Sequence, residues 1–289
     1  MEPSVAVILV NYNGYKDSVE CVESLLEITY SNYKIFLVDN CSTEKEKLCN
    51  SSVLAQNTQI IESKVNLGFS GGNNLAIKLA IEEGFDYVLL INNDTTVEPD
   101  FLTKLVSAAQ DNKETGIVAG KIYYYYQKDK VWSAGGEYDN KTGLTLQYSG
   151  DNLPEFDKKK YITFATGCLM LIPAAVVKKV GLLDETYFLY SEDSDYCQRV
   201  MAAGYKLIYE PQAIIYHKVS ASTGDRSPMQ QRYMMRNNLY MIKKYGTSKA
   251  KAYFSISIQM LKHIIRGRRN LMPTLKGYID FLKGKKGKI

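Results

Sequence analysis

The first half of the chain alternates between short apolar runs and segments in which apolar residues recur every three or four positions. The continuous apolar runs predict buried strands at 5–10, 34–39, 59–63 and 87–91. The helical spacing predicts helices at 18–28, 72–83 and 100–110. Because strands and helices in this alternation are typical of βα units, we expect an α/β fold with a mostly parallel central sheet flanked by helices.

The second half has a less regular pattern. It predicts strands at 116–126, 163–172, 206–209 and 214–216, a helix at 191–204, and hairpins with a loop at 130–160. Beyond Ser227 the pattern changes to helices with basic faces, at 229–245, 249–265 and 271–282. We therefore expect one α/β domain over 1–227 and a basic helical C-terminal extension over 228–289.

Polar residues follow several of the predicted strands. They are Asn11-Tyr12-Asn13-Gly14, Asp39-Asn40, Asn66 to Asn74, and Asn92-Asn93-Asp94. Parallel strands share one direction, so these residues should gather at one edge of the sheet, where open α/β sheets bind ligands. Asp94, a carboxylate at the end of a buried strand, suggests a site for a metal-bound phosphate. Asn-Asn-Asp-Thr is also good turn chemistry, and this tip alone leaves both interpretations open.

The glycine-rich segment 66–74 opens a predicted helix. Its backbone N–H groups could approach an anion or a nucleoside closely, and the residues expected to do so include Gly68, Gly71, Gly72 and Asn73. The alternative is a glycine loop needed only for a tight turn. The segment has neither the Walker pattern nor G-x-G-x-x-G, so a P-loop NTPase and a dinucleotide oxidoreductase are not supported.

Two further groups carry candidate chemistry. Glu192, Asp193 and Asp195 lie in the first turn of a predicted helix, where the macrodipole favours ionised carboxylates that could accept a proton from an alcohol. Helix capping alone would explain one or two of these acids. His217 follows a strand directly, and its imidazole together with the Asp94 carboxylate would suit Mn²⁺ or Mg²⁺, although a structural histidine is the alternative.

The net charge of +5 conceals an asymmetry, because residues 226–289 carry +15 and residues 1–225 carry −10. A basic tail of this kind implies attraction to phospholipid headgroups or to nucleic acid. The stretch 164–177 is too short for a spanning helix, and the N-terminus lacks the pattern of a signal peptide. We expect a cytoplasmic protein. The five cysteines contain no C-x-x-C pair and predict no zinc site.

With these motifs in this order, the chain resembles family 2 inverting glycosyltransferases with the GT-A fold, especially bacterial rhamnosyltransferases of cell-envelope polysaccharide biosynthesis. The resemblance covers roughly 5–245 and rests on 10–13, 38–40, 66–74, 92–94, 192–195 and His217. It implies a Rossmann-like nucleotide-sugar half over about 1–125 and an acceptor and catalytic half over about 126–227.

The resemblance also implies roles for individual residues. Asp193 would be the catalytic base, with Asp195 a second choice and Glu192 part of the same motif. Asp94 and His217 would bind the divalent metal, Mg²⁺ or Mn²⁺, although Asn92 replaces the first acid of the family's D-x-D motif. The residues expected to contact the donor are Asn11, Tyr12, Asn13, Asp39, Asn66, Gly68, Gly71, Gly72, Asn73, Asn92, Asn93 and Arg236.

The expected reaction is transfer of L-rhamnose from dTDP-L-rhamnose to a lipid-linked or growing surface glycan. Within the enzyme class, the alternative donor is UDP-galactofuranose or a UDP-hexose. Because Asn92 replaces an acid, a second alternative is a protein that binds the donor without catalysing transfer. We expect no nucleic-acid partner, because the first 225 residues are acidic and contain no recognised binding motif. The basic tail is expected to contact anionic lipid on the inner face of the cell membrane, with a solvated helical face or a homodimer contact as alternatives.

Overall fold

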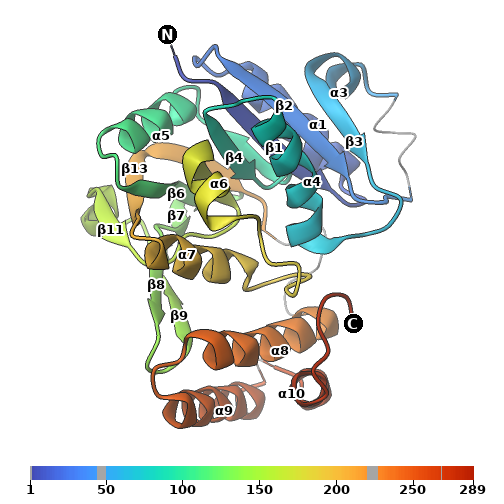
Figure 1. Cartoon of the computed structure of the whole chain (residues 1–289), viewed down its shortest axis with the longest axis vertical. Coiled ribbons are helices and arrows are strands. Elements are labelled where there is room, and N and C mark those ends of the chain that lie inside the picture. The colour runs from blue at the N-terminus through green and yellow to red at the C-terminus, as the bar shows by residue number, and fades with distance from the viewer. Residues whose placement is uncertain (1, 44–49, 220–226, 268) are drawn as a thin grey trace.

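A mixed β-sheet forms the centre of the computed structural model, which describes residues 2–43, 50–219, 227–267 and 269–289 (Figure 1). The strands of the first half are β1 (Val5–Asn11), β2 (Tyr33–Asp39), β3 (Thr58–Glu62) and β4 (Tyr87–Ile91). They run parallel in the order β3-β2-β1-β4. The prediction of an α/β fold is confirmed.

The second half makes the sheet mixed rather than mostly parallel. β12 (Leu169–Pro173) runs antiparallel between β4 and β6 (Thr115–Tyr124), and β6 pairs in parallel with β13 (Lys206–His217). The two short strands predicted at 206–209 and 214–216 are therefore one strand. Its register shifts between Glu210 and Ile214, around Pro211, which cannot donate a hydrogen bond to a sheet ladder.

Short strands complete the architecture. β5 (Thr95–Val97), β7 (Gln127–Ser133), β10 (Gly150–Asp151) and β11 (Lys160–Ile162) extend the main sheet. β8 (Gly136–Asp139) and β9 (Leu144–Gln147) form a separate hairpin within the segment where hairpins are predicted, and a 3-10 helix follows at Pro154–Asp157.

Helices cover both faces of the sheet. α1 (Tyr15–Leu26), α3 (Ser52–Asn57) and α5 (Phe101–Gln110) pack on one face, and α4 (Gly68–Glu82), α6 (Ala174–Val180) and α7 (Glu192–Ala202) pack on the other. Alternate strand residues serve the two faces, since Val7 packs with the first set and Ile8 with the second. This double burial explains why the strands are continuously apolar.

Three helices lie together at the end of the molecule that contains the C-terminus (Figure 1). They are α8 (Pro228–Tyr245), α9 (Lys249–Ile265) and α10 (Leu271–Leu282), with boundaries that equal the prediction or differ from it by one residue. Ser227 caps α8, because its hydroxyl accepts a hydrogen bond from the N–H of Gln230 at 3.1 Å. None of the described helices is long and apolar enough to cross a membrane.

The glycine-rich segment differs from the prediction, because α4 begins at Gly68 rather than at residue 72. Gly68 has φ +71°, and a Cβ there would lie 2.1 Å from the carbonyl oxygen of Phe188. A Cβ at Gly72 would lie 2.9 Å from Val10. These glycines let the first turns of α4 pack directly against β1 and the chain that leads into α7.

Gly68→Ala should therefore be more destabilising than Gly84→Ala, its matched control. Gly84 has φ +83°, but a Cβ there would meet no atom within 4 Å, so alanine should cost only about 1 kcal/mol for the left-handed backbone. At Gly68 the clash with a backbone carbonyl should raise the loss to about 3 kcal/mol. Urea unfolding measures both, and equal losses would contradict the packing role of Gly68.

Candidate active site

The ends of β1, β2 and β4 are joined by hydrogen bonds between polar side chains. Asn11 and Asp39 are register partners, and the Asn11 amide donates to the Asp39 carboxylate at 3.3 Å and to the Ser42 hydroxyl at 3.0 Å. The side-chain oxygen of Asn11 accepts from the N–H of Gly14 and from the side-chain amide of Asn93. The structure thus brings together the strand ends that the sequence predicts to converge.

The loop after β1 is held by its own asparagine. Asn13 has φ 57°, and its side-chain oxygen accepts from the N–H of Thr43 at 2.8 Å and from the Thr43 hydroxyl at 3.0 Å. Tyr12, in contrast, keeps 42% of its surface exposed. Both residues are exposed, but the side-chain oxygen of Asn13 is already bonded to Thr43, so Tyr12 is the better placed of these two predicted donor contacts to meet a ligand.

The start of α4 is not an open anion cradle. The N–H groups of Leu67 and Gly68 donate at 2.8 Å to the side-chain oxygens of Asn40 and Asn66, and the next N–H donates to the carbonyl of Phe188. The four predicted contacts in this helix are buried, namely Gly68, Gly71, Gly72 and Asn73. The prediction of backbone donors for a phosphate is corrected for the N–H groups of 67–69, because protein oxygens already accept from them.

Asp94 and His217 meet where β13 passes the end of β4. The Asp94 carboxylate lies 3.1 Å from the Nε2 atom of His217, and both side chains are buried. The edge of Trp132, the only tryptophan, packs against the imidazole with ring centroids 4.4 Å apart. Burial lowers the pKa of His217, but neighbouring Cys168 and Asp94 outweigh that effect and raise the pKa to about 10.

This pair fits a divalent cation. Neighbouring ligands of an octahedral ion lie about 3 Å apart when each is about 2.1 Å from the ion, which matches the spacing of the Asp94 and His217 atoms. Within the described residues, no group of three His, Cys, Asp or Glu side chains surrounds one point. An ion held here would therefore take its remaining ligands from a bound molecule or from water.

Four cysteines are free thiols, and Cys49 lies outside the described residues.

The three acids of α7 have three different environments. Asp193 is half-buried, and its carboxylate accepts from the N–H groups of Gly167 at 3.1 Å and Ser194 at 2.7 Å. Burial raises the pKa of Asp193. Glu192 is 6% exposed, its Oε2 atom has no hydrogen-bond partner among the described residues, and burial raises its pKa well above the usual value. Asp193 is the acid that keeps contact with solvent.

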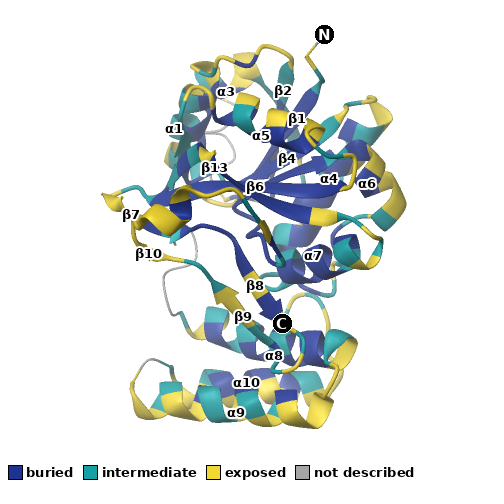
Figure 2. Cartoon of the chain, turned by 90° about the vertical axis from the view of Figure 1, so that its left-hand side faces the viewer, coloured by how far each residue is buried: buried dark blue, intermediate teal, exposed yellow. Residues whose placement is uncertain are grey.

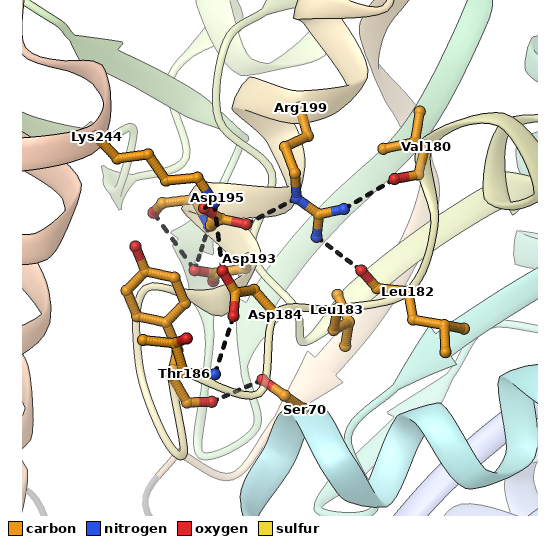
Figure 3. Close-up of polar contacts among 12 residues, drawn as sticks. Ser70, Val180, Leu182, Leu183, Asp184, Thr186, Asp193, Asp195, Arg199 and Lys244 are labelled. Carbon is orange, nitrogen blue, oxygen red and sulfur yellow. Dashed lines mark hydrogen bonds and ion pairs between the residues drawn. The ribbon is translucent and has the colours of Figure 1, made fainter. Parts of the chain in front are cut away.

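Asp195 is fully buried and saturated by partners (Figure 3). Its carboxylate accepts from Arg199 at 2.8 Å, from Lys244 at 2.6 Å and from the Tyr245 hydroxyl at 2.7 Å. Lys244 and Tyr245 belong to α8, so this carboxylate joins α7 to the C-terminal helices. The second choice for the base is corrected, because Asp195 has a structural role.

Arg236 also has a structural role rather than the predicted donor contact. Its guanidinium is fully buried and donates to the Gly287 carbonyl at 2.7 Å and to the side chain of Asn237 at 2.8 Å. The Asn237 amide in turn donates to the carbonyls of Leu189 and Tyr190 at 2.8 and 2.7 Å. The sequence singles out the Arg-Asn segment but gives no sign that it holds the entrance to α7.

That entrance is an unusual turn. Tyr190 and Ser191 have φ values of 69° and 73°, a left-handed backbone that residues with a side chain seldom adopt twice in succession. Such strain persists where surrounding contacts determine the conformation, and here Asn237 provides them. The turn sets where α7 begins and therefore where Asp193 lies.

Asp195→Asn and Asp193→Asn should have different effects on stability. Asparagine at 195 leaves Arg199 and Lys244 without a buried counter-charge, so the free energy of unfolding should fall by about 3 kcal/mol. Folding raises the pKa of Asp193, so its ionised form destabilises the protein above the usual pKa, and asparagine removes that charge. Asp193→Asn should leave urea unfolding at pH 7 unchanged or slightly improved. Equal losses would contradict this division of roles.

Comparison with known proteins gives the family of the chain. Residues 6–181 match the model of the family described as Glycosyl transferase family 2. The dTDP-rhamnosyl transferase RfbF of Shigella flexneri is 22% identical over 98% of this chain and 93% of its own length. The N-acetylglucosaminyl-diphospho-decaprenol L-rhamnosyltransferase of Mycobacterium tuberculosis is 24% identical over 78% of this chain and 79% of its own length. An uncharacterized Sinorhizobium fredii protein is 28% identical over 85% of this chain, which spans only 28% of that protein.

Two solved structures share the fold. GalNAc-T7 with UDP, GalNAc and Mn²⁺ superposes with a TM-score of 0.66 at 15% identity, over 83% of this chain and 48% of that one. The mannosyltransferase PcManGT of Pyrobaculum calidifontis, with GDP-Man and Mn²⁺, has a TM-score of 0.60 at 12% identity, over 99% and 89% of the two chains. Since the family model matches more than half of the sequence, the chain belongs to glycosyl transferase family 2 and has its GT-A fold.

Proposed function

We propose that this chain is a metal-dependent, inverting glycosyltransferase that moves L-rhamnose from dTDP-L-rhamnose to a hydroxyl of a lipid-linked or growing cell-surface glycan. One observation carries the proposal: a single dipeptide contacts both halves of the site. The N–H of Gly167 donates to Asp193, and the carbonyl of Cys168 accepts from the N–H of Asn92, two residues before Asp94. The candidate base and the candidate metal pair therefore lie on the same edge of the sheet.

Each group has a task in this reaction. Asp193 would accept the proton of the acceptor hydroxyl as its oxygen attacks the anomeric carbon, on the side opposite the leaving nucleoside diphosphate, which inverts that carbon. Asp94 and His217 would hold the divalent ion, which supplies positive charge to the departing diphosphate. Asn92 is neutral, so the protein offers one carboxylate at this tip instead of two.

The nucleoside would lie over the ends of β1 and β2. Asp39 can accept a hydrogen bond from the N–H of a pyrimidine base, and Asn11 fixes that carboxylate from the side. Exposed Tyr12 offers a ring for contact with the base. Asn13, Asn66 and Asn93 would act indirectly, because their side chains hold the loops around this position.

The choice of sugar rests on the relatives. RfbF is named a dTDP-rhamnosyl transferase, and the mycobacterial relative is named for a lipid-diphosphate acceptor and for L-rhamnose. A hexosyltransferase of Haloferax volcanii, 26% identical over 69% of this chain, supports the alternative of a hexose donor such as a UDP-sugar. Both solved neighbours contain Mn²⁺, in line with a divalent cofactor.

The donor and the metal can be tested together by thermal shift. With Mn²⁺, saturating dTDP-L-rhamnose should raise the melting temperature by about 5 °C, because a ligand at a hundred times its Kd stabilises a protein by about 2.7 kcal/mol. Chelation with EDTA, Asp94→Asn or His217→Ala should remove most of the shift, and Asp151→Asn on exposed β10 is the matched control. A shift with UDP-hexoses alone would overturn the rhamnosyl donor. No shift with any nucleotide sugar would overturn the proposed function.

Asp193→Asn should separate catalysis from binding. The amide cannot take the acceptor's proton, so transfer should fall by about a thousandfold while the donor-induced thermal shift remains. In the wild type kcat should decrease as the pH falls below the raised pKa of Asp193, since only the ionised form is a base. Transfer is followed with radiolabelled donor and a prenyl-diphosphate glycan. Unchanged turnover in the variant would remove Asp193 from this role, and binding without turnover in the wild type would favour a non-catalytic donor-binding protein.

A further inference from the structure

α10 packs against the protein with its small and polar residues. Thr274, Gly277 and Asp280 are the buried positions, and a Cβ on Gly277 would lie 2.3 Å from the carbonyl oxygen of Arg232 in α8. The Asp280 carboxylate is 2.5 Å from Arg232 and 3.0 Å from Lys285. These contacts fix which side of α10 faces the protein.

Most of the apolar residues of α10 point the other way, and Phe281, which packs on Tyr240 with ring centroids 5.0 Å apart, is the large side chain that faces inward. Six of the apolar residues are between 40% and 67% exposed, namely Leu271, Met272, Leu275, Tyr278, Ile279 and Leu282. A surface helix of a water-soluble domain normally buries its apolar stripe and turns its polar residues outward. α10 does the reverse, so its outer side is built for a medium other than water.

α9 adds to this surface. It packs on α8 through Ala252, Ile256 and Met260 and leaves three large residues outside, Phe254, Leu261 and Ile265. Their spacing of seven and four positions places them on one side of the helix. Figure 2 shows exposed residues along α9 and α10 at the end of the molecule remote from the N-terminus. Each helix thus presents a row of large exposed apolar residues, and such residues mark a binding surface.

The positive charge around these apolar residues indicates which kind of partner would bind them. Residues 226–289 carry +15, and their only acid, Asp280, is already paired with Arg232 and Lys285. Exposed basic residues stand on both helices, Lys262 on α9 and Lys276 on α10. A second copy of the chain would bring two strongly positive surfaces together, whereas an anionic lipid surface would attract the exposed basic residues of both helices.

We propose that α9 and α10 form an interfacial membrane-binding surface that inserts the outward apolar residues among the headgroups of a bilayer containing anionic phospholipid. Helices of this composition lie in the plane of the interface, which agrees with the finding that no described helix could cross a membrane. This inference is independent of the proposed reaction, because it concerns lipid binding without donor or acceptor.

α8, on which α9 and α10 pack, is bonded to the helix that carries the candidate base. Lys244 and Tyr245 at the end of α8 bind the Asp195 carboxylate in α7, and Asn237 binds the turn before it. A bilayer bound to α9 and α10 would therefore set Asp193 at a fixed height above the lipid. Such an arrangement suits an acceptor whose sugar is attached to a lipid in that bilayer.

Flotation of the full chain with vesicles tests the surface. Wild-type protein should float with vesicles of phosphatidylcholine and phosphatidylglycerol and much less with phosphatidylcholine alone. Leu275→Ser with Ile279→Ser removes two outward apolar residues that are each 46% exposed, and should weaken binding by at least about tenfold. Lys276→Gln with Lys283→Gln should weaken binding to the anionic vesicles, and added salt should do the same. Leu146→Ser with Leu153→Ser, exposed apolar residues outside α9 and α10, is the matched control and should bind as wild type.

Other results would overturn the proposal. Equal flotation of the wild type and the Leu275→Ser, Ile279→Ser variant would show that α10 does not insert, provided circular dichroism shows both folded. Sedimentation equilibrium tests whether a second copy of the chain binds this surface instead. If the wild type is a dimer, the variant is a monomer and vesicle binding is unchanged, the surface is a homodimer interface. Because flotation needs no donor, loss of the glycosyltransferase proposal would leave this result unaffected.

Discussion

The buried carboxylate of Asp195 is the interaction on which the arrangement of the two parts of the molecule depends. A charge removed from water requires opposite charges and hydrogen bonds around it, and Asp195 obtains them from Arg199 within α7 and from Lys244 and Tyr245 at the end of α8. Arg199 also donates to the carbonyls of Val180 and Leu182 (Figure 3). The carboxylate thus fixes α7 against the chain after α6 and against the C-terminal helices at once.

Neutral amides hold the other side of the site. The side chains of Asn11, Asn40 and Asn93 each bond to more than one partner, so they cross-link the strand ends mostly through neutral groups, with Asp39 as the buried carboxylate among them. An asparagine can satisfy a carbonyl and an N–H at the same time, which suits a place where several loops meet. Few charged groups therefore lie near the strand ends. The carboxylates of Asp39 and Asp94 are the negatively charged hydrogen-bond acceptors there.

The C-terminal helices connect the candidate chemistry to the surface of the molecule. Asn237 supports the left-handed turn before α7, and Arg236 beside it holds the last residues of the chain through Gly287. The same bundle exposes the apolar side of α10. One set of packed helices would thus both position the base and contact a lipid surface.

The sequence by itself determined the elements and the candidates. Apolar periodicity is a local property, so the strands β1 to β4 and the bounds of α9 and α10 follow from it, and chain direction predicts that Asn11, Asp39 and Asp94 converge. Only the tertiary structure decided which of two acids close together in the sequence is buried. Asp193 and Asp195 are two positions apart on a helix, a rotation of about 200°, so one of them must face inward. The partners that stabilise Asp195 as the inward one are Lys244 and Tyr245, about fifty residues further along the chain. Long-range packing likewise buried Arg236 and closed the start of α4 against Phe188, whereas His217 lies 3.1 Å from Asp94, the residue with which the sequence already pairs it.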